Sequence, residues 1–390
     1  MTRRQDGWSS STYSTHASFV YSNQYTTPVV DLLDPQFGED ILDLGCGHGE
    51  LTLEGLLPRV VFERHPCRSD PTTCPPPPPP SSTTTVDSFS TDAKEEGGRR
   101  TGSIVGLDSS RTLLDTARER TSDALLKAAQ LQATSSDRPS VHVDHHQVEW
   151  VERDGHDLSE WYRTISSTRT EPGQDQGGRG GGGRGTGIAW ERERSSTILD
   201  RVTKEGGFDA VFSNAALHWM KRDPARVVRG VWDVLKSGAR FVGEFGGFLN
   251  MIGVRSALHS ALSRRGIDPN EVDPWFFPTE RHYRALLETQ GFVVESCELV
   301  PRMTPLPTGL EGWLETFAFA FLDAVGSSPT ADRSSSASTT TSDRGDRDVR
   351  SEVIREVCDA CQVDMRDPVS GKWRVMYVRL RFKATKPRAT

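Results

Sequence analysis

A glycine-rich segment near the N-terminus has the residue types and spacing best suited to ligand binding. It reads Asp43-Leu-Gly45-Cys-Gly47-His-Gly49 and overlaps the end of the short apolar run 40–45. Glycines let the backbone turn sharply and approach a ligand without interference from a Cβ atom. The G-x-G-x-G spacing differs from the G-x-G-x-x-G of dinucleotide-binding folds, which place a pyrophosphate at a helix N-terminus. An acid before the loop favours a ligand that carries an ammonium group.

Two later strand-like runs also end in polar side chains. Asp108 ends the run 103–108, and Asn214 ends the run 208–214. Ligands of open parallel sheets bind at the carboxyl ends of the strands, so we expect these residues to gather at one site. S-adenosylmethionine (SAM) has an ammonium group and a ribose with two free hydroxyls, whose hydrogen bonds a carboxylate in the place of Asp108 can accept. The residues therefore indicate SAM as the ligand.

Three segments resemble motifs of the class I, seven-β-strand SAM-dependent methyltransferases. They are DILDLGCGHGELT, IVGLDSS and FDAVFSNAALHWM. The NAALHWM box and the N-terminal segment starting at Trp8 are most similar to the trans-aconitate methyltransferase-like branch of the methyltransferase type 11 group. The resemblance covers most of residues 8–300. The cofactor-binding residues that we expect are Asp43, Gly45, Cys46, Gly47, Asp108, Ser109, Asp154, Gly155, Asn214 and Ala215.

The resemblance implies a role for each acid. Asp43 would hold the ammonium group directly or through water, Asp108 the ribose hydroxyls, and Asp154 the adenine amino group. Each acid also has a structural interpretation. Asp108 could cap the following helix, with Ser109 as the alternative cap. Asp154 could be a solvated loop acid, with Asp144 or Asp157 as a competitor for its role.

His218 is the candidate general base, because an imidazole titrates near the working pH. A buried packing residue is the alternative interpretation. Trp8, Tyr13 and His16 are predicted to form an aromatic lid over the substrate, or else to staple the N-terminus to the domain. A carboxylate acceptor, with a pKa of about 4, is ionised at neutral pH and needs no base.

The substrate pocket is expected beside the region that follows the fifth strand and the helix 310–324. Its lining candidates are Trp275, Phe276, Phe277 and Trp313, and Arg255 is one of several arginines that could hold an acidic substrate. A small molecule is the predicted acceptor, and a carboxylate oxygen is one acceptor atom that fits. An RNA or protein methyltransferase is an alternative, which the Gly/Arg tract 177–187 suggests. A non-catalytic SAM-fold scaffold is another.

Strand-like and helix-like segments alternate along the chain, which predicts an α/β, Rossmann-like doubly wound sheet with helices on both faces. The sheet is expected to be mostly parallel, with an antiparallel C-terminal edge strand. The predicted strands are 40–45, 103–108, 147–153, 208–214, 239–245, 292–299 and 374–384. The predicted helices are 111–132, 223–236, 257–265, 281–290 and 310–324.

One domain is predicted, with core segments at about 8–65, 101–165, 197–326 and 351–386. Three low-complexity stretches, 66–100, 166–196 and 327–350, are expected to be disordered insertions in surface loops. Such insertions are expected to cost little free energy of folding, because the entropy of loop closure grows only with the logarithm of loop length.

Composition narrows the class of partner. The chain has 390 residues and a net charge of −7, so no overall field draws it to nucleic acid. Its six scattered cysteines do not form a disulfide framework, and Cys358-x-x-Cys361 lacks a second pair of ligands, so no metal site is predicted. No apolar run is long enough to cross a bilayer, and the cytoplasm is the default location.

Overall fold

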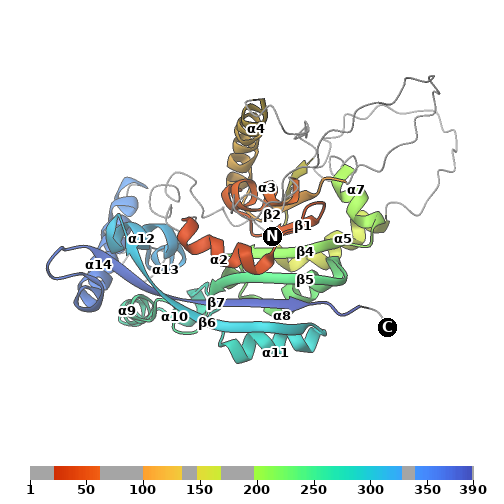
Figure 1. Ribbon diagram of the computed structural model, residues 1–390. Helices are drawn as coiled ribbons and strands as arrows, with labels where there is room; N and C mark the ends of the chain where they lie inside the picture. The colour runs from red at the N-terminus through yellow and green to blue at the C-terminus, as the bar shows by residue number, and fades with distance from the viewer. Residues whose placement is uncertain (1–21, 62–99, 134–146, 168–196, 327–338, 389–390) are drawn as a thin grey trace, which may run out of the picture.

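The computed structural model describes residues 22–61, 100–133, 147–167, 197–326 and 339–388. Its centre is one seven-stranded sheet in the order β3-β2-β1-β4-β5-β7-β6 (Figure 1). The strands are β1 (Asp40–Leu44), β2 (Ser103–Asp108), β3 (Val148–Glu152), β4 (Phe208–Asn214), β5 (Leu235–Gly246), β6 (Val293–Leu306) and β7 (Trp373–Thr385). The Rossmann-like α/β prediction is confirmed.

Strands β1 to β5 pair in parallel, and β7 is antiparallel to both β5 and β6. The antiparallel C-terminal strand is therefore as expected, but it does not lie at the edge. It lies between β5 and β6, and β6 forms the edge of the sheet. The alternating apolar residues of β7 explain this position, because Leu380 and Phe382 are fully buried in the core beneath it.

The two faces of the sheet carry separate cores. Ile41 of β1 packs with α2 (Asn23–Leu33) and α3 (Leu57–Val61), whereas the next residue, Leu42, packs on the opposite face. This alternation is the two-residue period of a strand. Four helices cover that second face, namely α5 (Leu158–Ser167), α7 (Thr197–Lys204), α8 (Pro224–Val234) and α11 (Glu280–Gln290) (Figure 1). Helix α4 (Arg111–Ala133) contacts β2, β3 and the π-helix Thr52–Leu56 that precedes α3.

A third core lies beyond the carboxyl end of β5 and is built mainly by five helices, which we call the helical cap (Figure 1). They are α9 (Ile252–Ser263), α10 (Pro269–Val272), α12 (Gly309–Phe317), α13 (Phe319–Gly326) and α14 (Thr339–Met365). The ends of β6 and β7 extend into this core through Leu306, Val375 and Tyr377. The long edge strands thus join the cap to the sheet.

The prediction of a disordered insertion over 327–350 was wrong for its second half. Residues 339–350 belong to α14, whereas 327–338 lie outside the described residues. The physical reason is an apolar stripe further along the same helix. Val353, Val357 and Cys361 recur every four residues and are buried against the rest of the helical cap.

Three predicted helices have clearly different bounds. The helix predicted at 257–265 is α9 and begins five residues earlier. The segment 310–324 is two helices that meet at Ala318, a buried residue with φ −97° and ψ 18°. Helix α8 ends at Val234 rather than 236, because Leu235 already pairs with Phe208 as the first residue of β5. Asp223 caps α8, accepting from the backbone N–H of Arg226.

None of the helices that the structure describes has the length and apolar composition needed to cross a membrane.

Candidate active site

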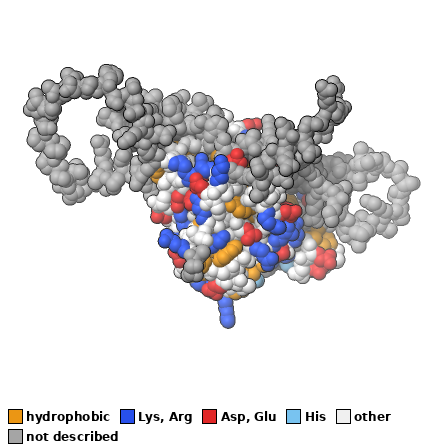
Figure 2. Space-filling view, turned by 90° about the vertical axis from the view of Figure 1, so that its right-hand side faces the viewer, with side chains coloured by type: hydrophobic (Ala, Val, Ile, Leu, Met, Phe, Trp, Pro, Cys, Tyr) orange, Lys and Arg blue, Asp and Glu red, His pale blue; other side chains and the backbone are white. Residues whose placement is uncertain are grey.

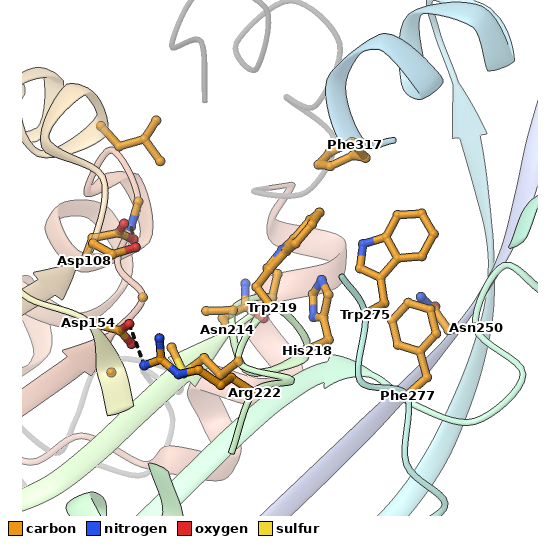
Figure 3. Close-up of a pocket in the computed structure, with 18 of the residues that line it drawn as sticks. Asp108, Asp154, Asn214, His218, Trp219, Arg222, Asn250, Trp275, Phe277 and Phe317 are labelled. Atoms are coloured by element: carbon orange, nitrogen blue, oxygen red, sulfur yellow. Dashed lines mark hydrogen bonds and ion pairs between the residues drawn. The ribbon is translucent and has the colours of Figure 1, made fainter. Parts of the chain in front are cut away.

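A cavity of about 390 Å³ lies at the carboxyl ends of β1, β2 and β4, within the range of roughly 300–1,000 Å³ that holds small ligands. Its acidic side carries Asp108 and Asp154, and its aromatic side carries Trp275, Phe277 and Phe317, with Asn214, Trp219 and His218 between them (Figure 3). The cavity therefore joins a polar compartment to an apolar one.

The glycine loop after β1 forms one wall of the polar compartment. Gly45, Gly47 and Gly49 have φ values of 77°, 57° and 75°, which side-chain-bearing residues rarely adopt. A Cβ atom on Gly45 would lie 2.2 Å from the Cβ of Ala216. The loop thus requires glycine both for its backbone conformation and for its close approach to the segment after β4.

Asp108 ties this loop to the end of β2. The backbone N–H of Gly47 donates to its Oδ2 at 2.9 Å, and the N–H of Ser110 donates to its Oδ1 at 2.9 Å. Ionised carboxylates accept hydrogen bonds and do not donate them, so Asp108 presents an acceptor at this end of β2. Ser110 rather than Ser109 caps α4, because its hydroxyl accepts from the N–H of Leu113, and Ser109 lines the cavity.

Asp154 is fixed by its neighbours at the other corner of the polar compartment. Its Oδ1 accepts from the backbone N–H and from Nδ1 of His156, and its Oδ2 accepts from Arg222 at 3.0 Å. These partners lower the pKa of Asp154, which is therefore ionised at neutral pH. The adjacent Gly155 also lines the cavity, where a Cβ atom would lie 2.9 Å from Met220.

Asn214 and Ala215 lie at the carboxyl end of β4 and line the cavity as expected. Ala215 has a positive φ of 56°, and its N–H donates to the carbonyl of Glu244 on β5 at 2.7 Å. This bond holds the turn that brings the two residues to the cavity.

Asp43 and Cys46, in contrast, do not line the cavity. Asp43 is buried behind the glycine loop, where it accepts a hydrogen bond of 2.6 Å from the hydroxyl of Thr52. Burial and the nearby Asp108 raise the pKa of Asp43 to about 7, and burial raises the pKa of the Cys46 thiol well above its usual value. Asp43 is thus placed to support the loop rather than to touch a ligand.

His218 lies between Trp219 and Trp275 (Figure 3) and is nearly fully buried. Its Nδ1 accepts from the backbone N–H of Gly246 at 3.3 Å, so a neutral ring carries its proton on Nε2. Burial and the charge of Arg379 lower the pKa of His218 well below the usual value. In this tautomer the ring donates from Nε2 and has no free lone pair with which to act as a base.

The aromatic compartment contains most of the lining residues expected from the sequence. Trp275, Phe277 and Trp313 line the cavity, but Phe276 packs in the core beneath the sheet instead. Arg255 is absent from the lining. Its Nε donates to the buried carboxylate of Asp273 at 2.7 Å, so it is not the arginine that faces this cavity.

Sequence reasoning missed the contribution of the last strand. Tyr377 and Arg379 of β7 line the cavity because β7 is inserted beside β5. Their two-residue spacing in the alternating run 374–384 places them on one face, but the sequence does not show which strand lies next to them.

Several sequence predictions fall on residues that the structure does not describe, namely Trp8, Tyr13, His16 and the Gly/Arg tract 177–187. Across the described ranges no group of three or more His, Cys, Asp and Glu side chains is arranged to hold a metal ion. Cys361 belongs to the core of the helical cap, and Cys358 packs against it.

Comparison with known proteins gives matches to a family, to a relative and to solved structures. Residues 192–243 match the family described as "Methyltransferase domain". An uncharacterized methyltransferase of Schizosaccharomyces pombe, C70.08c, is 38% identical over 187 residues, which are 46% of this chain and 63% of the yeast protein. The chain thus spans less than two thirds of that relative.

Two solved structures are similar at low identity. The YcgJ protein from Bacillus subtilis has a TM-score of 0.41 and 10% identity, with coverage of 96% of this chain and 100% of that one. A SAM-dependent methyltransferase from Thiobacillus denitrificans, solved with S-adenosyl-L-homocysteine, has a TM-score of 0.38 and 11% identity, with coverage of 98% and 94%.

Proposed function

We propose that this chain is a class I methyltransferase that binds SAM in the cavity and transfers the methyl group to a small-molecule acceptor. One observation carries the proposal. Asp108 and the glycine loop form a polar compartment that opens directly into an aromatic compartment within the same cavity. A cofactor and an acceptor can therefore meet there.

The polar compartment fits SAM in its chemistry. The glycine loop offers close backbone approach, and the carboxylate of Asp108 lies beside it as an acceptor of the kind that ribose hydroxyls require. Asp154 can still accept from an amino group, because Oδ2 accepts only from Arg222 among its resolved partners. These roles, and those of Ser109, Gly155, Asn214 and Ala215, belong to the proposal.

When bound, SAM supplies a methyl group that its positively charged sulfur activates. The residues of the chain then have to align the acceptor and exclude water, and alignment alone can supply roughly 7–11 kcal/mol at best. Trp219, Trp275 and Phe277 provide a wall that suits this task. His218 cannot serve as the base in its present hydrogen bonding, so an acceptor that is already ionised, such as a carboxylate oxygen, fits the site best.

Calorimetric titration of SAM tests the cofactor assignment, with NAD as the negative control. We expect SAM to bind and NAD not to bind. Asp108→Ala is expected to weaken SAM binding by about 10-fold to 100-fold, the loss typical of hydrogen bonds to a charged group. Asp115→Ala, which removes an exposed acid from the first turns of α4, is the matched control and should leave the affinity unchanged. Absence of SAM binding by folded wild-type protein would exclude the proposed enzyme and favour the scaffold alternative.

A further inference from the structure

Arg379 is a buried cation that has no polar partner among the residues that the structure describes. Its side chain lines the cavity, the residue is only 5% exposed, and its Nε is buried without a hydrogen bond. The one contact of its guanidinium that the structure describes is with the ring of Tyr377, 4.3 Å from the ring centroid. A buried charge without a partner costs several kcal/mol, so its presence at a ligand cavity points to a partner supplied by the ligand.

The neighbouring arginines do have partners. Arg302 of β6 and Arg381 of β7 both bind the buried carboxylate of Glu244, with N–O distances of 3.1 and 2.6 Å. Glu244 is therefore occupied by two cations. No carboxylate within the described part of the chain forms an ion pair with Arg379.

Strand register explains why Arg379 lacks a partner. It lies opposite Gly246 on β5 and Val300 on β6. Neither residue has a polar side chain, and Gly246 leaves space that Phe277 occupies, since a Cβ atom there would lie 2.4 Å from the Phe277 ring. Both neighbouring strands thus leave the guanidinium to face the cavity.

His218 adds a second donor to the same end of the cavity. Its Nδ1 is occupied by the N–H of Gly246, the residue opposite Arg379, so the neutral ring offers only Nε2–H. Gly246 thus links the two side chains, and both line the cavity. A guanidinium and an imidazole N–H beside aromatic rings form an environment for an anion.

We propose that Arg379 binds an anionic group of the methyl acceptor and so determines substrate specificity. The ligand class is an organic anion, a carboxylate or a phosphate, either of which a guanidinium can bind with two parallel hydrogen bonds. The apolar part of the acceptor packs among Trp275, Phe277 and Phe317. This inference rests on the proposed methyltransferase function, because it assigns the acceptor of that same site.

Three probes that share a phenyl group test the proposal in the full-length protein saturated with S-adenosylhomocysteine. Phenylacetate and phenyl phosphate carry the two candidate anions, and phenylacetamide is the uncharged control. Each is titrated calorimetrically into wild type, Arg379→Gln, Arg379→Lys and Arg374→Gln. Arg374 is an exposed residue of the same strand, so the same substitution there serves as the matched control.

At least one anion is expected to bind wild type and Arg374→Gln, and to bind Arg379→Gln about tenfold or more weakly. Arg379→Lys is expected to recover part of the affinity, because it restores the charge but not the planar donor pair. The amide is expected to bind all variants alike. The ratio of phenylacetate to phenyl phosphate affinity then identifies the preferred anion.

Protein stability provides an independent readout. Arg379→Gln removes an unpaired buried charge, so the ligand-free variant is expected to have a Tm equal to or above that of wild type. A clear loss of Tm would indicate a structural partner and contradict the proposal. Equal anion affinity in wild type and Arg379→Gln, or no anion binding by wild type, would also overturn it. SAM titration of the same variants separates this failure from failure of the cofactor assignment.

Discussion

Asp43 shows how a single residue of a ligand-binding motif can act from behind the loop. It lies in the core, its one described side-chain partner is the hydroxyl of Thr52, and its pKa is raised to about 7. The folded state thus holds the proton of Asp43 more tightly than the unfolded state, where the pKa is about 4. The tighter proton binding by Asp43 adds to the free energy of unfolding. This contribution is fully present below about pH 4 and is lost as the pH rises to about 7.

Asp43→Asn is accordingly expected to gain stability relative to wild type as the pH rises. An asparagine oxygen can still accept from Thr52 but does not ionise. One pKa unit corresponds to about 1.4 kcal/mol, and nearly two units of the difference fall between pH 5 and pH 8. The difference in unfolding free energy between the proteins should therefore shift by about 2.6 kcal/mol over that range. Urea unfolding at both pH values measures it. Asp115→Asn, at an exposed acid, should follow wild type, and parallel pH curves for Asp43→Asn and wild type would contradict the prediction.

His218 makes a second prediction at the residue scale. Because burial keeps the ring neutral and Gly246 occupies Nδ1, methyl transfer to an ionised acceptor should not depend on a base that titrates near pH 6.5. With an acceptor found by screening organic acids, kcat/KM is expected to be flat between about pH 6 and pH 8. A rising limb near pH 6.5 that disappears in His218→Gln would restore the role of general base.

Among the elements, α14 is the one whose contribution the sequence concealed. Its first residues are rich in Ser, Thr and Asp, which is typical of disordered segments, but its later turns carry the apolar stripe that closes the helical cap. This core also contains Trp313 and Tyr377, whose side chains line the cavity. The helix thus supports the aromatic compartment without contacting a ligand itself.

Two valine-to-alanine changes in α14 test that contribution. Val357 is 0% exposed and Val363 is 81% exposed. Removing two buried carbon atoms at Val357 should lower the unfolding free energy by about 2 kcal/mol, from the lost burial and the residual cavity. Val363→Ala should change it by less than about 0.5 kcal/mol. Chemical denaturation of both variants measures these changes in unfolding free energy. Equal changes would show that the apolar stripe of α14 is not part of the core.

For the molecule as a whole, we propose that the described segments form one domain whose long insertions are dispensable. The chain leaves the described structure at Val61 and returns at Arg100, where the N–H of Gly102 donates to the carbonyl of Val60 at 3.0 Å. The two ends of this stretch therefore already meet.

Basic and acidic side chains are interspersed on the described surface that Figure 2 shows.

Replacing 64–98 by a four-residue Gly/Ser linker is expected to leave the Tm and the SAM affinity unchanged, because the ends are held together by β1, β2 and α3. A single cooperative unfolding transition is expected for both proteins. Scanning calorimetry measures the Tm and shows whether unfolding has a single transition, and titration calorimetry measures the SAM affinity. Loss of SAM binding with a normal Tm would show that the insertion contributes to the site.

The sequence by itself determined the α/β order, the parallel strands and the positions of the glycine loop, Asp108, Asp154 and Asn214, because each depends on local patterns. Apolar runs predict buried strands, and residues at the carboxyl ends of parallel strands converge. These signals placed most of the expected polar residues at one cavity.

Only the tertiary structure determined which residues line the end of the cavity that we propose for the acceptor. The position of β7 between β5 and β6 brings Arg379 to the cavity, and the burial of Asp43 behind the loop removes it. Strand order and depth depend on contacts between residues far apart in the chain, so no local pattern reports them. The same holds for His218. Burial and then the charge of Arg379 on β7 lower its pKa, and a backbone N–H on β5 selects its tautomer.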